Sequence, residues 1–144
     1  MSRRLARENA FKTLFQIDVG KIDPKKALER ALQESGLNKK NSAFIRELVE
    51  GVLNKQEDID QVIKKYLVNW NLKRLANVDR SILRLAVFEI LYRPDIPTVT
   101  AIDEAVELAR IYQGKKSASF INGLLDRVMR DFAVKETEDE IFGD

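Results

Sequence analysis

Three arginines stand at helical spacing near the start of the chain, and the whole sequence contains no cysteine and no histidine. Those absences exclude thiol nucleophiles, disulfides, Cys/His zinc sites and Ser-His-Asp triads. At 100° per residue, Arg3, Arg7 and Arg4 fall at about 0°, 40° and 100° of one helix face, beside the apolar stripe that contains Phe15. Arginines so close to a core cannot be buried unpaired. They predict either phosphate binding where the stripe ends, or a solvated helix end whose arginine stems cover apolar surface.

A second unusual stretch, "GKKSASFING", lies near the C-terminus. Phe120 falls at the edge of an apolar stripe beside Gly123, with Lys116 and Ser119 on the polar side. A glycine inside a helix costs around 1 kcal/mol relative to alanine, and its usual benefit is close approach by another chain. Aromatic rings beside lysines can stack on unpaired bases. Phe120 is therefore either a stacking platform or a core residue.

An acidic helix face carries Asp103, Glu104 and Glu107. A di-metal carboxylate bundle also requires histidine, and acids in the first turns of a helix stabilise its dipole. Glycine-rich phosphate loops are missing from the sequence. We therefore expect no metal site, no cofactor and no catalytic residue.

The 144 residues are 44% hydrophobic and 33% charged, which suits one compact domain. Of the net charge of +2, the last ten residues, "KETEDEIFGD", contribute −4, so the rest carries +6. Such an excess favours a polyanionic partner, although it also serves solubility. An apolar run of about 20 residues and a signal peptide are both missing, which predicts a cytoplasmic protein without a membrane partner.

Apolar residues recur at helical spacing along most of the chain and predict an all-α fold without a sheet. Ser2, Asp23 and Asn77 are expected caps, and Gly36 and Gly114 expected helix ends. The helix after Asn77 is apolar on all sides, as in a buried helix. Residues around Trp70 predict an irregular link with one helical turn. The seven predicted helices cover 3–18, 24–35, 40–54, 57–67, 77–92, 98–113 and 117–132.

This pattern divides the chain into an N-terminal helical half, residues 1–55, and a C-terminal helical half, residues 56–134. Residues 135–144 are expected to form an acidic, disordered tail.

The segments "RRLARENAFKTLF", "LRLAVFEIL" and "AIDEAVELARIYQGKKSASFINGLLDRV" resemble the NusB family of bacterial transcription antitermination factors over essentially the whole chain. The resemblance implies a single compact domain of two three-helix bundles that is not an enzyme. It also implies binding to single-stranded boxA RNA of nascent ribosomal transcripts. The partners would be the ribosomal protein NusE and the antitermination complex of RNA polymerase.

The family's motifs fall on specific positions of this chain. The RNA surface would include Arg3, Arg4, Arg7, Phe15, Phe120 and Asn122. The family often has arginine in place of Leu5 and a basic residue in place of Ser119, and Lys115 and Lys116 can compensate from the preceding turn. We therefore add Lys115, Lys116 and Ser119 to the predicted RNA surface. NusE is expected along Asp79, Arg80 and Arg84.

Two alternatives remain open at this point. A helical protein-interaction module or homodimer, using the first helix as its contact face and binding no RNA, would show the same apolar edge. Ribosomal RNA cytosine methyltransferases carry a similar domain, but those longer chains need a cysteine nucleophile, which this sequence does not contain.

Overall fold

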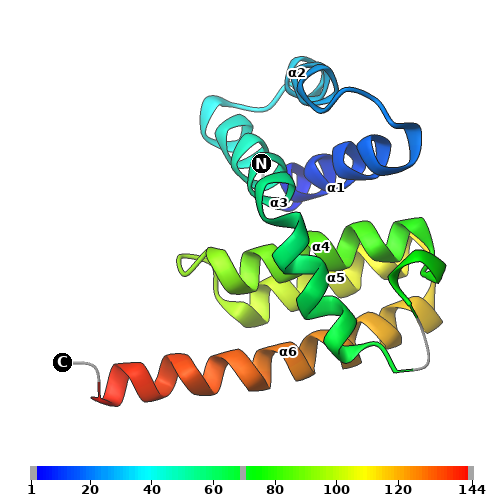
Figure 1. Cartoon of the computed structure of the whole chain (residues 1–144). Coiled ribbons are helices and arrows are strands. Elements are labelled where there is room, and N and C mark those ends of the chain that lie inside the picture. Colours follow the sequence, from blue (N-terminus) through cyan, green and yellow to red (C-terminus); the bar gives the residue numbers. More distant parts are fainter. Residues whose placement is uncertain (1–2, 69–70, 143–144) are drawn as a thin grey trace.

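A computed structural model describes the backbone of residues 3–68 and 71–142, and the side chains of these residues up to residue 132. The described part is all-helical, as predicted, and contains no strand (Figure 1). The predicted cap Ser2 and the link residue Trp70 lie outside it. The elements are α1 (Arg3–Gly20), α2 (Pro24–Ser35), α3 (Lys39–Tyr66), the short 3-10 helix η1 (Leu72–Arg74), α4 (Asn77–Tyr92), α5 (Thr98–Tyr112) and α6 (Lys115–Phe142).

The helices form two groups that are joined by α3. In Figure 1, α1 and α2 lie with the first turns of α3 at the top, and α4, α5 and α6 lie below, while α3 crosses from one group to the other. The buried apolar side chains of both groups form one continuous cluster. The prediction of a single compact domain is therefore confirmed, whereas the division into residues 1–55, 56–134 and 135–144 stays a prediction.

The predicted helices 40–54 and 57–67 are a single helix, α3, of 28 residues. The buried face continues without a break from Val52 to Ile59 and Ile63, and residues 52–66 contain neither glycine nor proline. At about 1.5 Å per residue, α3 is about 42 Å long. The described chain thus has six α-helices and η1 in place of seven, and α6 continues beyond the predicted end at residue 132.

Local helix signals place most of the boundaries correctly. The Asp23 carboxylate caps α2, and Gly36 and Gly114 end α2 and the α5 segment with φ of 64° and 105°. Such left-handed backbone favours glycine. The predicted cap Asn77 is instead the first residue of α4, which has no side-chain cap.

The centre of the fold is α4, in which residues 81–90 are all buried, as its all-round apolar pattern predicts. It packs against α3 at Gly51, where a Cβ atom would lie 2.1 Å from the ring of Phe88. The Phe88 ring occupies the space that a larger side chain would need. Glycine at position 51 therefore allows this ring to lie against the backbone of α3.

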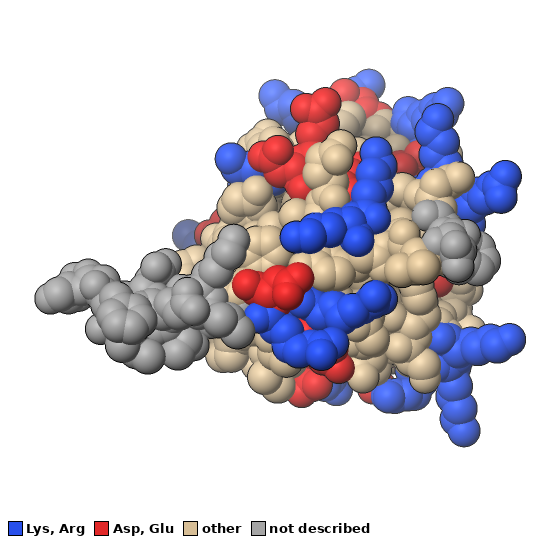
Figure 2. Space-filling view, turned by 60° about the horizontal axis from the view of Figure 1, so that its bottom comes forward, with Lys and Arg blue, Asp and Glu red and all other residues tan. Residues whose placement is uncertain are grey.

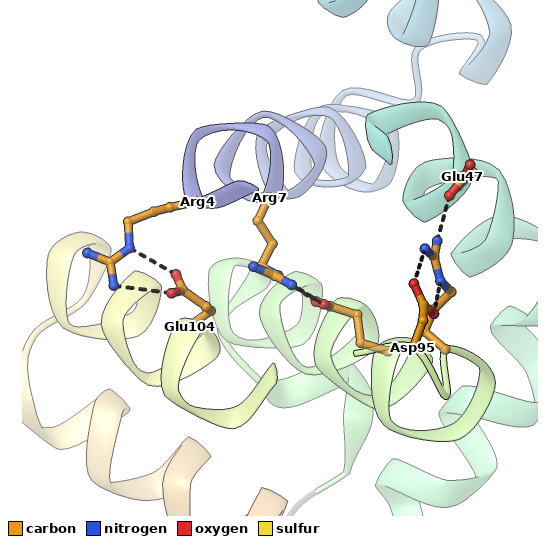
Figure 3. Close-up of polar contacts among 7 residues, drawn as sticks. Arg4, Arg7, Glu47, Asp95 and Glu104 are labelled. Atoms are coloured by element: carbon orange, nitrogen blue, oxygen red, sulfur yellow. Dashed lines mark hydrogen bonds and ion pairs between the residues drawn. The ribbon is translucent and has the colours of Figure 1, made fainter. Parts of the chain in front are cut away.

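A buried ion pair fixes α1 on α4 (Figure 3). The Nε of Arg7 donates to the two oxygens of the Glu89 carboxylate at 2.9 and 3.1 Å, and a terminal nitrogen of the guanidinium lies 2.8 Å from the same carboxylate as an ion pair. The two side chains are only 6% and 2% exposed. Burial raises the pKa of Glu89, and the hydrogen bond and charge of Arg7 oppose that rise.

We expect Gly51→Ala to destabilise the protein, because the added methyl group overlaps the Phe88 ring. Overpacking typically costs about 1–3 kcal/mol, more than the roughly 1 kcal/mol that alanine gains in helix propensity. Gly123→Ala is the matched control: its Cβ would meet nothing within 4 Å, so stability should rise. Urea denaturation measures both, and an equal gain in the two variants would contradict the close approach.

We expect Arg7→Met to lower the free energy of unfolding by about 3–5 kcal/mol at neutral pH, because Glu89 is left buried and unpaired. The double variant Arg7→Met with Glu89→Leu should recover most of this loss. A carboxyl with a raised pKa in the folded state costs stability above its unfolded pKa, so the single variant's deficit should shrink as pH falls. Urea denaturation at pH 7.5 and pH 5 measures the free energy of unfolding of both variants. The expectation is refuted if the loss in Arg7→Met is the same at both pH values, or if Glu89→Leu does not reduce it.

Candidate nucleic-acid interface

The three arginines of α1 contact three different helices. Arg7, the middle one on the wheel, enters the core and meets Glu89 of α4. On one side of it, the Arg3 guanidinium lies 3.9 Å from the ring centroid of Phe44 in α3. On the other side, Arg4 reaches α5 (Figure 3). The predicted exposed cluster of three cations is therefore wrong for Arg7, because its charge is needed inside the protein.

Arg4 stays at the surface and forms a bidentate ion pair with Glu104. Its Nε and one terminal nitrogen each donate to a different oxygen of that carboxylate, both at 3.1 Å. Arg4 is 69% exposed, whereas Glu104 is 16% exposed. The guanidinium therefore keeps an edge toward solvent while its direction is set by α5.

A second contact ties the middle of α1 to the end of α5. The hydroxyl of Tyr112 donates to Glu8 at 2.7 Å, and the Tyr112 ring lies 5.1 Å from that of Phe11. Burial and the Glu8 carboxylate raise the pKa of Tyr112 to about 12. Together with the pair of Arg4 and Glu104, this contact joins α1 to the middle and the end of α5.

Two neighbouring hollows lie on the surface where α1, α5 and α6 meet. The first, of about 320 Å³, is lined by Arg4, Asp103, Val106, Glu107, Arg110 and Asn122. The second, of about 360 Å³, is lined by Val106, Arg110, Lys115, Ala118, Ser119 and Asn122. They share three lining residues, so the hollows adjoin one another. The structure thus brings the predicted residues Arg4, Lys115, Ser119 and Asn122 to one surface.

The other predicted RNA residues lie elsewhere. Phe120 and Asn122 are 200° apart around α6, at opposite edges of its buried face, and Phe120 is partly buried against the core. Phe15 is also partly buried, 6.4 Å from the Phe11 ring. Lys116 is exposed on the open side of α6.

Sequence reasoning did not include Arg110, although it lines both hollows. Its ion pair with Glu107, three residues earlier on α5, offers a sequence signal, since residues at this spacing share a helix face. The Arg110 face of α5 lies beside α6 because the chain turns at Gly114. The periodicity of apolar residues does not predict the direction of such a turn.

The residues predicted for NusE lie along α4 and are already paired within the protein. Arg80 bonds Asp18 of α1 at 2.7 Å, and Arg84 bonds Asp60 of α3 at 2.8 Å. Both arginines line a hollow of about 560 Å³ with these acids. Asp79 is partly exposed and accepts a hydrogen bond from the hydroxyl of Ser117 in α6.

Charges of both signs are distributed over the surface. Figure 2 shows basic and acidic side chains interspersed with broad neutral areas on the face that it presents. Among the described residues, acidic side chains form no group that could hold a metal ion. Within the same residues, every helix is too short or too polar to cross a membrane.

Comparison with known proteins gives consistent matches over most of the chain. The NusB family profile matches residues 4–130. A transcription antitermination protein NusB of Heliobacterium modesticaldum is 49% identical over 91% of this chain, which spans 64% of that protein. The NusB protein of Bacillus subtilis is 47% identical, over 91% of this chain and 97% of its own length.

Solved structures agree with the sequence matches. A structure of T. maritima NusB has a TM-score of 0.85 and 39% identity, covering 90% of this chain and 92% of that one. A crystal structure of the antitermination factors NusB and NusE in complex with double-stranded RNA has a TM-score of 0.83 and 28% identity, covering 90% and 96%. Family profile, relatives and fold point to one assignment: the chain belongs to the NusB family.

Proposed function

We propose that this protein is a transcription antitermination factor that binds single-stranded boxA-type RNA together with NusE and acts on RNA polymerase during transcription of ribosomal RNA. Relatives at 47–49% identity are transcription antitermination proteins. A solved relative combines NusB with NusE and double-stranded RNA, and another similar chain belongs to a structure described as a plectonemic RNA supercoil. These relatives support RNA and NusE as partners.

The observation that carries the proposal is the surface where α1, α5 and α6 meet. Arg4, Arg110 and Lys115 place three cations from three helices around two adjoining hollows. Residues far apart in sequence meet there, and their chemistry suits a polyanion with exposed bases. Cations neutralise phosphates and fix the register of the strand, with affinity that falls as salt rises.

Polar groups between the cations are suited to reading bases. Ser119 and Asn122 line the second hollow and can bond the edges of unpaired bases. In a duplex those edges are already paired, so a single strand fits this surface better. The proposal therefore concerns single-stranded RNA even though the solved relative holds a duplex.

A strand that crosses α6 would pass from Asn122 over Ser119, Gly123 and Lys116 to Phe120, in that order around the helix. Ser119, Gly123 and Lys116 are exposed, and no side chain rises from the glycine. In this path the partly buried ring of Phe120 would stack on a base. Such stacking is worth about 1–3 kcal/mol per base.

The roles proposed for α1 differ among its predicted RNA residues. Arg4 would contact phosphate with its free edge, and Arg3 is exposed at the start of the helix and could do the same. Phe15 would offer a partial stacking surface. Arg7 is buried, so its contribution would be to hold α1 in place through Glu89.

For NusE, we propose a contact along α4 that centres on Asp79. Arg80 and Arg84 would act there mainly by joining α4 to α1 and α3, because both are already paired with acids. The cavity that they line carries two further lysines, Lys64 and Lys73, at its rim.

We expect Lys115→Ala and Arg4→Ala each to weaken binding of a boxA-containing RNA strand and to reduce the salt slope of log K by about one unit for each phosphate that is no longer neutralised. The control is Lys26→Ala, an exposed lysine on α2 that lies away from both hollows. Filter binding across a salt series, with and without NusE, measures affinity and slope. Unchanged slopes in both variants would contradict this RNA surface, and no binding by the wild type would contradict the function.

We expect Asp79→Ala to weaken the complex with NusE, because the substitution removes a charged group from the interface. Ser117→Ala is the matched control, since it breaks the same intramolecular hydrogen bond but leaves the carboxylate in place. Calorimetric titration with purified NusE compares the two. Equal losses of affinity in both variants would show that the bond between α4 and α6 matters and that Asp79 does not contact NusE.

A further inference from the structure

The surface proposed to bind RNA contains acids as well as bases. Asp103, Glu104 and Glu107 all lie on α5, between Arg4 and Arg110. A phosphate placed against these carboxylates would be repelled. Glu104 and Glu107 are paired with Arg4 and Arg110, which leaves Asp103 as the acid whose presence on this surface suits a part of the RNA other than phosphate.

The two hollows differ in charge. The hollow at the start of α6 has Arg110 and Lys115 among its lining residues and no acid, which suits a phosphate. The hollow beside α1 has Arg4 and Arg110 facing Asp103 and Glu107, so its charges balance. A wall made of Val106, Arg110 and Asn122 is common to both. A basic hollow thus adjoins a neutral one that presents hydrogen-bond acceptors.

The acids of the neutral hollow are not equally engaged. Of its two acids, Glu107 forms an ion pair with Arg110, while Arg4 is held by Glu104, which does not line the hollow. Asp103 is exposed, and among the described residues no hydrogen bond or ion pair involves its carboxylate. Both of its oxygens are therefore open to a ligand, while the flanking guanidinium planes of Arg4 and Arg110 offer surfaces on which a base can stack.

We propose that the two hollows hold one nucleotide of the RNA, with the phosphate in the basic hollow and the base in the neutral one, and that Asp103 selects guanine there. This inference rests on the proposed function and names the base that the surface reads. An ionised carboxylate only accepts hydrogen bonds. Guanine offers it two adjacent donors, N1–H and the 2-amino group. Uracil offers one N–H between two carbonyl oxygens, which the carboxylate repels.

The volume and lining of the neutral hollow suit this role. At about 320 Å³ it lies at the lower end of the range of about 300–1,000 Å³ for small-molecule sites. Val106 supplies apolar contact for the base. Asn122, which lines both hollows, can donate to and accept from the nucleotide between them.

The test compares three short single-stranded RNAs that are uridine-rich and differ at one position, which is guanine, inosine or uracil. Inosine lacks the 2-amino group and is otherwise identical to guanosine. Fluorescence anisotropy with the full chain, in the presence and absence of NusE, gives the three affinities. The wild type should bind the guanine RNA roughly tenfold more tightly than the inosine RNA, because inosine keeps N1–H but loses one of the two hydrogen bonds to the carboxylate.

In Asp103→Asn this preference should disappear, because an amide presents a donor as well as an acceptor. Its affinity for the uracil RNA should stay the same or rise, since one negative charge is removed. Asp58→Asn, an exposed acid on α3, makes the same change in net charge away from both hollows and should keep the preference. A thermal melt of each variant checks that it is folded.

The outcomes separate this inference from the function on which it rests. If Asp103→Asn binds all three RNAs more tightly by the same factor, the carboxylate only repels RNA and the inference is overturned. Equal wild-type affinity for guanine and inosine RNA also overturns it, while leaving RNA binding intact. If the wild type binds none of the three, alone or with NusE, the proposed function itself fails.

Discussion

The buried pair of Arg7 and Glu89 is the interaction on which the rest of this structure depends. It places a charge from the first turns of the chain against the most buried helix of the C-terminal half. A buried pair adds little net stability compared with apolar residues of similar size, but it tolerates only one arrangement of its partners. Its main effect is to fix where α1 lies on α4 and how far α1 is rotated about its own axis.

The surface chemistry follows from that rotation. With Arg7 directed inward, Arg4 must emerge on the side of α5, and Arg3 on the side of α3. Only Arg4 then joins the hollows that α5 and α6 form. Three cations at the positive end of a helix dipole are unfavourable, and each of the three is stabilised by a contact with a different helix. Of the three arginines only Arg7 is buried, while Arg3 and Arg4 keep exposed side chains.

Much of the fold could be predicted from sequence because its signals are local. The caps at Asp23, Gly36 and Gly114 and the all-round apolar pattern of α4 each depend on a few neighbouring residues. The continuity of α3 could not be predicted with the same ease, because its polar stretch near residue 55 resembles a link and only packing on both sides keeps it helical.

The site was less predictable, because the angular position of a residue on its helix does not show which residue of another helix it contacts. The wheel placed the three arginines on one face but could not show that Arg7 meets Glu89. A signal was present: Glu89 is the one acid between residues 82 and 92, where Arg84 is the only other charged residue, and a buried acid requires a counter-charge. The hollows beside α5 depend on how α6 folds back, which periodicity does not encode.

The unbroken course of α3 bears on how the molecule loses its structure. Its first turns belong to the upper group and its last turns to the lower group, with Gly51 against Phe88 between them. Neither group can detach without melting helical turns that the other also uses. Opening events confined to one group are therefore costly, and the backbone amides of α3 should exchange with solvent mainly through global unfolding.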